Sequence, residues 1–91
     1  MSETKTQNRL ASLRSELRQI DANIFALTEK RMRLSRQIGE LKKNAGLGIE
    51  DTTQEQRNLD QNQNLASDEL PAAMIDELTR LLVNWSKKAQ K

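Results

Sequence analysis

The sequence predicts an all-α protein in which a long, a short and a medium helix form an intertwined homodimeric helical bundle. Apolar residues recur at alternating steps of three and four from Leu10 to Leu41, which is the periodicity of an amphipathic helix with a coiled-coil-like seam. Strong helix formers fill most other positions, and the one proline, Pro71, lies outside this stretch. A second apolar helical pattern approaches the C-terminus.

The long helix is expected to begin near Leu10. Gly39 weakens it close to its end, and Gly46 and Gly48 are typical of a helix stop. The polar residues 1–8 are expected to form a flexible N-terminus. The seam consists of nine residues: Leu10, Leu13, Leu17, Ile20, Ile24, Leu27, Leu34, Ile38 and Leu41.

The length of this helix predicts a dimer. At about 1.5 Å per residue, Leu10 to Leu41 spans roughly 47 Å. A compact globule of this chain length is only roughly 30 Å across. The seam therefore needs a partner at both ends, and an intertwined homodimer is the simplest solution.

A short, polar helix is predicted after a loop at 44–51. Thr52 is followed three residues later by Glu55, which matches a capping box at a helix start. Little apolar content follows, and the helix is expected to run to about Asn64.

The medium helix is expected to begin at Ser67, which two acidic residues follow as in an N-cap, with Pro71 tolerated in the first turn. The whole chain, residues 1–91, is expected to form one domain. The apolar face of this helix has six members: Met74, Leu78, Leu81 and Trp85, with Ile75 and Leu82 alongside.

Composition excludes several classes of chemistry. The chain has neither cysteine nor histidine, which removes disulfides, thiolate metal sites, the commonest zinc ligands and histidine-based acid–base catalysis. A net charge of +2, from 15 basic and 13 acidic residues, is too small an excess to indicate nucleic-acid binding. The polar N-terminus and the lack of a long apolar run predict a cytoplasmic protein that binds no membrane.

Three cations on the long helix draw attention by their spacing. Arg31 interrupts the apolar seam, so it turns outward, pairs with an acidic residue, or lines an anion site. Lys42 follows it by 11 residues, so both point from one face about 16 Å apart. Arg14 lies roughly 25 Å before Arg31 and on another side. Alone it is typical of a coiled-coil flanking charge, but an antiparallel partner chain could bring it to the ligand of Arg31.

These positions resemble a known family, the all-α (type II) chorismate mutases. The likeness covers about Leu10 to Gln90 and continues beyond the first helix at Gly46, Ile49, Asp51, Glu55, Ser86 and Gln90. Four segments of the first helix are similar: Leu10-Ala-Ser-Leu13-Arg14, Ile20-Asp21, Glu29-Lys-Arg31 and Ile38-Gly39-Glu-Leu-Lys42.

The resemblance implies an intertwined homodimer with two active sites, each of which takes one arginine from the other subunit. Arg14 would be that borrowed residue and Arg31 the resident one, and together they would bind the two carboxylates of chorismate. Ser86 would help with a carboxylate. No cofactor is implied.

The remaining implied roles concern the reacting oxygen and the ring. Lys42 and Gln90 would hydrogen-bond the ether oxygen, while Glu55 and the backbone near Asp51 would meet the ring hydroxyl. The implied reaction is the Claisen rearrangement of chorismate to prephenate, in phenylalanine and tyrosine biosynthesis. It needs orientation of the substrate and stabilisation of charge on the ether oxygen, without nucleophile, metal or obligatory proton transfer.

Gln54 departs from the family pattern, because members often carry arginine directly before the glutamate that Glu55 matches. Either a nearby cation such as Lys43 or Arg57 compensates, or the activity is reduced or the substrate differs. Isochorismate pyruvate lyases and 4-amino-4-deoxychorismate mutases share this fold. A cationic amino group near Glu55 would meet less repulsion from glutamine than from arginine at position 54.

Two other interpretations stay open. The capping box at Thr52 explains Glu55 without any ligand. A non-catalytic helical dimerisation module would fit the heptads equally well, but it leaves Arg31 in the seam unexplained.

Overall fold

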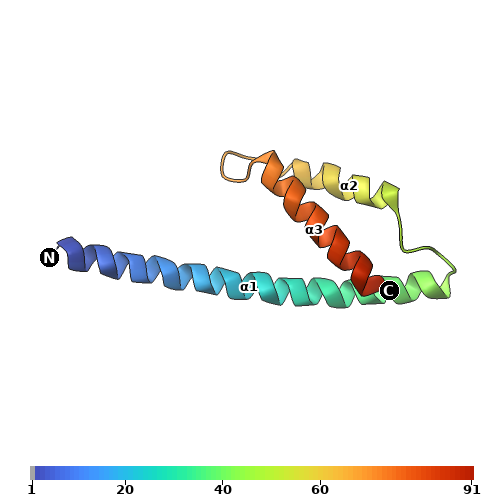
Figure 1. The fold of residues 1–91 in the computed structure, drawn as a ribbon, viewed down its shortest axis with the longest axis horizontal. Helices are drawn as coiled ribbons and strands as arrows, with labels where there is room; N and C mark the ends of the chain where they lie inside the picture. The colour runs from blue at the N-terminus through green and yellow to red at the C-terminus, as the bar shows by residue number, and fades with distance from the viewer. Residues whose placement is uncertain (1) are drawn as a thin grey trace. The chain divides into compact units, whose positions relative to one another are not determined.

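The computed structural model of the chain describes residues 2–91. Three helices, α1 (Ser2–Asn44), α2 (Thr52–Gln63) and α3 (Ala72–Gln90), follow one another in these residues without any strand (Figure 1). The prediction of an all-α chain with a long, a short and a medium helix is confirmed. None of the three helices described is both long enough and apolar enough to span a membrane.

The chain divides into two compact units, an N-terminal unit that ends at Lys30 and a C-terminal unit, Arg31–Lys91. The described part of the N-terminal unit is helical throughout and begins at Ser2, well before Leu10, because the intervening polar residues include no helix breaker and place Glu3 at the positive end of the helix dipole. That residues 1–8 are flexible stays a prediction.

Helix α1 ends in a Schellman motif built on Gly46. The N–H of Gly46 donates to the carbonyl of Lys43 over 3.2 Å, and the N–H of Leu47 to that of Lys42 over 2.7 Å. Gly46 has a φ of 72°, in the left-handed region that glycine adopts without steric cost. The predicted stop is therefore correct at Gly46, and the chain after it turns back toward Lys42.

Helix α2 begins one residue earlier than the capping-box prediction requires. Its N-cap is Asp51, whose Oδ1 accepts the N–H of Gln54 over 3.0 Å. The assignment of Thr52 as the cap is wrong, because the carboxylate one residue before it takes that role. Glu55 therefore lies outside the cap and is available for another partner.

The predicted N-cap at Ser67 is also wrong. Ser67 instead closes a tight turn with Leu70, because its Oγ accepts the N–H of Leu70 and its N–H donates to the carbonyl of Leu70. A residue before proline is driven out of the helical region, and Pro71 itself is extended, with φ −60° and ψ 152°. Helix α3 therefore starts only at Ala72.

The C-terminal unit packs through a narrow stripe of α3 that includes Ile75 from the predicted apolar face but leaves most of that face uncovered. Ile75 and Thr79 are buried, and the Thr79 hydroxyl accepts a hydrogen bond from the amide of Asn62 on α2 over 2.9 Å. Ile75 is the one buried apolar side chain in the described part of the protein. Most of the other predicted apolar positions are exposed: Met74, Leu78, Leu81 and Trp85 on α3, and all nine seam residues of α1, while Leu82 is half-buried.

Helix α3 contacts α1 along small and polar residues of the C-terminal unit. Ser35 and Gly39 are both buried, one helical turn apart, between the half-buried Arg31 and Lys42. A Cβ atom at position 39 would lie 2.6 Å from the Cα of Gln90. The absence of a side chain at Gly39 therefore permits the close approach of the two helices.

Candidate functional site

One pocket in the C-terminal unit gathers most of the residues singled out in the sequence. Its cavity volume is about 70 Å³, and the pocket is partly open to solvent. All three helices and the loop before α2 contribute to it. Its lining consists of Arg31, Lys42, Ile49, Asp51, Gln54, Glu55, Asn58, Val83, Ser86, Lys87 and Gln90.

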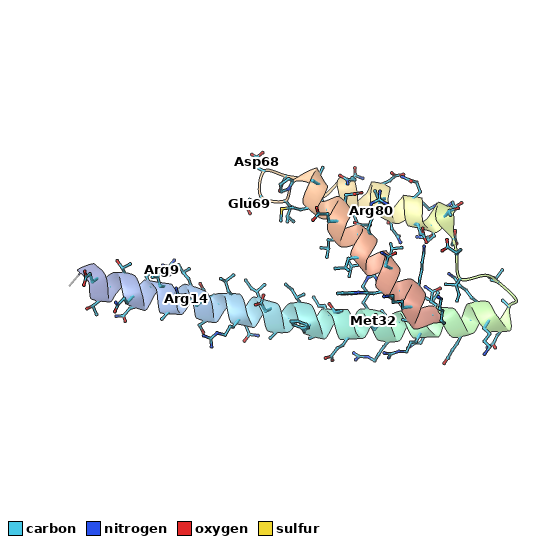
Figure 2. All side chains as sticks on the ribbon, viewed as in Figure 1. Arg9, Arg14, Met32, Asp68, Glu69 and Arg80 are labelled. Atoms are coloured by element: carbon cyan, nitrogen blue, oxygen red, sulfur yellow. The ribbon has the colours of Figure 1, made fainter. Side chains whose placement is uncertain are left out.

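Arg14 is the one predicted site residue that does not line this pocket. It belongs to the N-terminal unit, where it is exposed on α1, as its label in Figure 2 shows. Its assignment to the site of a partner subunit stays a prediction.

Arg31 turns toward α3 rather than out to solvent. Its Nη1 donates to the carbonyl of Leu82 over 3.0 Å and to the Oγ of Ser86 over 2.5 Å. In the part of the chain that the structure describes, no carboxylate lies within 4.0 Å of the Arg31 guanidinium. Among the described residues Arg31 therefore neither turns outward nor has an acidic partner, and the third interpretation, that it lines an anion site, stays a prediction.

Ser86 is fixed by two donors. Besides Arg31, the buried Ser35 donates from its Oγ to the Oγ of Ser86 over 2.9 Å. A hydroxyl oxygen accepts two hydrogen bonds and donates one. Ser86 therefore has its own proton left for a ligand acceptor.

Lys42 is held in the same way, by neutral oxygens. Its Nζ donates to Oε1 of Gln90 over 2.9 Å and to the carbonyl of Ile49 over 3.2 Å. The Schellman turn brings the Ile49 carbonyl back to the side chain at the end of α1. No carboxylate of the described residues lies within 4.0 Å of this ammonium, so its charge is oriented but not neutralised.

Gln90 is the last residue of α3, and its backbone lies against Gly39 of α1. Figure 1 shows the C-terminal end of α3 next to α1. Its Oε1 accepts from Lys42, so its amide N–H groups are available to a ligand oxygen. The contact with Gly39 holds its backbone, although terminal residues of helices commonly fray.

Lys87 is a pocket residue that the sequence reasoning missed. Its Nζ contacts Oε1 of Glu55 at 2.6 Å and Oε1 of Glu50 at 3.0 Å. These two carboxylates, Glu55 foremost, raise the pKa of the Lys87 ammonium above its ordinary value. The available signal was its spacing on α3, one turn after Val83 and three residues before Gln90, which places all three on one helical face.

The surroundings of Gln54 show which positively charged side chain lies near Glu55, where family members often carry an arginine. Gln54 lines the pocket and donates from its amide to Oδ1 of Asn58 over 3.0 Å. The two candidates for a compensating charge, Lys43 and Arg57, do not line this pocket. The cation beside Glu55 is Lys87.

The pocket thus has two electrostatic regions. Arg31 and Lys42 present positive charge with no acidic partner among the described residues, whereas Lys87 is paired with Glu55. Such a surface suits an anionic ligand that also carries a polar neutral group. Among the described residues, no cluster of three or more acidic side chains could hold a metal ion.

Comparison with known proteins gives one match. The family model described as chorismate mutase type II matches residues 13–91, which is nearly the whole chain. No curated protein and no solved structure matches it.

Proposed function

The chain belongs to the type II chorismate mutase family, and we propose that it converts chorismate to prephenate, a step of phenylalanine and tyrosine biosynthesis, as a homodimer. One observation carries the choice of an anionic substrate. Arg31 and Lys42 line the same pocket, and neither has a carboxylate partner in the described part of the chain. A half-buried charge of this kind is costly unless an anion meets it.

The carboxylates of the substrate would be held by arginines. Arg31 is positioned by α3, and its planar guanidinium is suited to a carboxylate in two-point contact. The hydroxyl proton of Ser86 would add a second donor to the same group. A dicarboxylate needs a further cation, and we assign this role to Arg14 of the partner subunit.

The dimer is supported by the apolar seam of α1. Each of its nine residues is exposed in the single chain, and so large an apolar surface is unfavourable in water. A second copy that packs on this seam would bury it and supply an arginine from the partner subunit.

Lys42 and Gln90 would carry out the central electrostatic task. During the rearrangement the ether C–O bond breaks as a C–C bond forms between the enolpyruvyl methylene and the ring, and no atom leaves the molecule. Negative charge develops on the ether oxygen. The ammonium of Lys42 and the amide N–H of Gln90 are donors suited to that oxygen, and their mutual hydrogen bond orients both beforehand.

The ring hydroxyl would meet the acidic side of the pocket. The Glu55 carboxylate can accept a hydrogen bond from it while Lys87 holds the other side of that carboxylate. Asp51, which caps α2, would contribute through its backbone, and Gln54 would border the same region.

The chemistry is compatible with the composition of the chain. The reaction is intramolecular, so the protein has to select a reactive conformation and stabilise charge, without a nucleophile or an acid–base pair. Arginine, lysine, amide and hydroxyl groups can do both, and the chain has no histidine or cysteine.

The test is an ultraviolet assay of chorismate consumption with identification of the product. Parallel reactions contain isochorismate and 4-amino-4-deoxychorismate, the substrates of the sister activities on this fold. Prephenate formed at catalytic rates supports the proposal. Pyruvate released from isochorismate, or exclusive turnover of the amino compound, would assign the sister activity instead. A folded dimer that consumes none of the three would be a dimerisation module.

A further inference from the structure

Lys87 makes an unusual pair of contacts for a residue at the wall of a ligand pocket. Its ammonium lies 2.6 Å from Glu55 on α2 and 3.0 Å from Glu50 on the preceding loop. The side chain of Lys87 is 25% exposed and that of Glu55 is 29% exposed, while Glu50 is largely in solvent. The pair with Glu55 is therefore the inner, better shielded one.

The three cations of the pocket differ in their partners. Arg31 and Lys42 are bonded to neutral oxygens, whereas Lys87 is bonded to two carboxylates. Lys87 therefore partly neutralises these two carboxylates and acts mainly at short range. Its effect is local, on whatever lies next to Glu55.

The position next to Glu55 is where the charge of a ligand group matters most. A neutral hydroxyl can donate to the Glu55 carboxylate without any conflict with Lys87. A cationic amino group in the same place would lie close to the Lys87 ammonium, and this repulsion offsets its attraction to the Glu55 carboxylate. Without Lys87, the Glu55 carboxylate would attract that amino group instead.

We propose that Lys87 is a specificity-determining residue, which makes the pocket accept a hydroxyl and reject an ammonium at the ring end of the substrate. The proposal rests on the proposed function, because it takes Glu55 as the group that meets the ring substituent. It selects chorismate over its analogue in which an amino group replaces the ring hydroxyl.

The experiment compares the two substrates on the same enzyme preparation. The value of kcat/KM is measured for chorismate and for 4-amino-4-deoxychorismate, and where the amino compound is not turned over, its inhibition constant against chorismate replaces the second value. The variants are Lys87→Met, which removes the charge at similar volume, and Lys87→Gln, which retains hydrogen bonding. A purely structural defect lowers both rates together and cancels in their ratio.

Two matched controls accompany these variants. Lys87→Arg keeps the positive charge at the site, and Lys88→Met removes a charge from the next residue, which is exposed and does not line the pocket. Both are expected to keep the wild-type preference.

The expected result is a shift of the preference toward the amino compound by about tenfold or more in Lys87→Met and Lys87→Gln. An unchanged preference in both variants, with chorismate still converted, overturns the role of Lys87 and leaves the proposed function intact. A wild-type protein that already prefers the amino compound also overturns it. Wild-type protein that converts neither compound overturns the proposed function, and the role of Lys87 with it.

Discussion

Gly39 and Gln90 lie so close together that a methyl group on residue 39 would stand 2.6 Å from both the Cα and the carbonyl oxygen of Gln90. This approach places the last turn of α3 against α1, where the Gln90 side chain accepts from Lys42. Glycine costs about 1 kcal/mol in a helix interior relative to alanine. The close contact is the structural reason for glycine at this position.

Gly39→Ala is therefore expected to reduce kcat by about ten- to a hundredfold, because displacement of the end of α3 separates Gln90 from Lys42. The far-UV circular dichroism should remain helical. Gly48→Ala is the matched control, since a Cβ atom there meets nothing within 4 Å. Equal activity in both variants would show that the contact with Gln90 is not needed for turnover.

Lys42→Ala should retain the fold and lose about 3–4 kcal/mol of transition-state stabilisation, which is the range seen when one donor to a developing oxyanion is removed. The measurement is kcat for chorismate together with the thermal unfolding curve. Lys43→Ala, which removes an exposed neighbour outside the pocket, should remain close to wild type. Near-parental activity in Lys42→Ala would contradict its role at the ether oxygen.

The partner's arginine can be tested by complementation. Arg14→Ala and Lys42→Ala should each be inactive as homodimers. Mixed dimers contain one site with both defects and one site with none, so equal mixing should restore about a quarter of the wild-type sites. A mixture that exchanges subunits but stays inactive would rule out a site shared in this way.

The cap of α2 is a test of the structure itself. Asp51→Ala should lower the free energy of unfolding by about 1 kcal/mol, because the N–H of Gln54 loses its acceptor. Thr52→Ala, one residue further, should change it by less than about 0.5 kcal/mol. If urea unfolding shows a larger loss of stability for Thr52→Ala than for Asp51→Ala, then Thr52 is the cap.

The ion pairs of Lys87 predict an alkaline limit to its contribution. Its pKa is raised in the folded state, so the stabilisation is complete below the unfolded-state pKa of about 10.4 and is lost as pH rises through the higher folded value. The difference in unfolding free energy between wild type and Lys87→Met should be constant at pH values of about 8 to 10, which lie below the unfolded-state pKa. The difference should shrink at higher pH. A difference that persists undiminished at the highest pH would mean that packing, not charge, accounts for it.

Sequence periodicity predicted the three helices correctly but misplaced their starts: α1 begins at Ser2 rather than near Leu10, and the caps predicted for the other two are wrong. Thr52 and Ser67 are both acceptable caps by residue type. Asp51 supplied a stronger acceptor one residue earlier, and the extended backbone at Pro71 prevented a helix from forming over Ser67. Local preference cannot rank competing caps without the path of the chain between the helices.

For the pocket, seven predicted residues proved to lie together: Arg31, Lys42, Asp51, Gln54, Glu55, Ser86 and Gln90. Their roles remain proposals. Lys87 and Ser35 were missed because each acts through a partner from a distant part of the chain. The spacing of Lys87 to Gln90 places it on the pocket face of α3, but neither Lys87 nor Ser35 reveals its partner in the sequence.

The sequence by itself determined the helical class, the end of α1 at Gly46, the apolar seam and the absence of histidine and cysteine chemistry, because these follow from spacing and composition along one segment. Only the tertiary structure decided which charges are neutralised. Arg31 and Lys42 bond to neutral oxygens while Lys87 takes the carboxylates. That distribution depends on where α3 meets α1 and α2, and long-range contacts of this kind are set by packing rather than by local sequence.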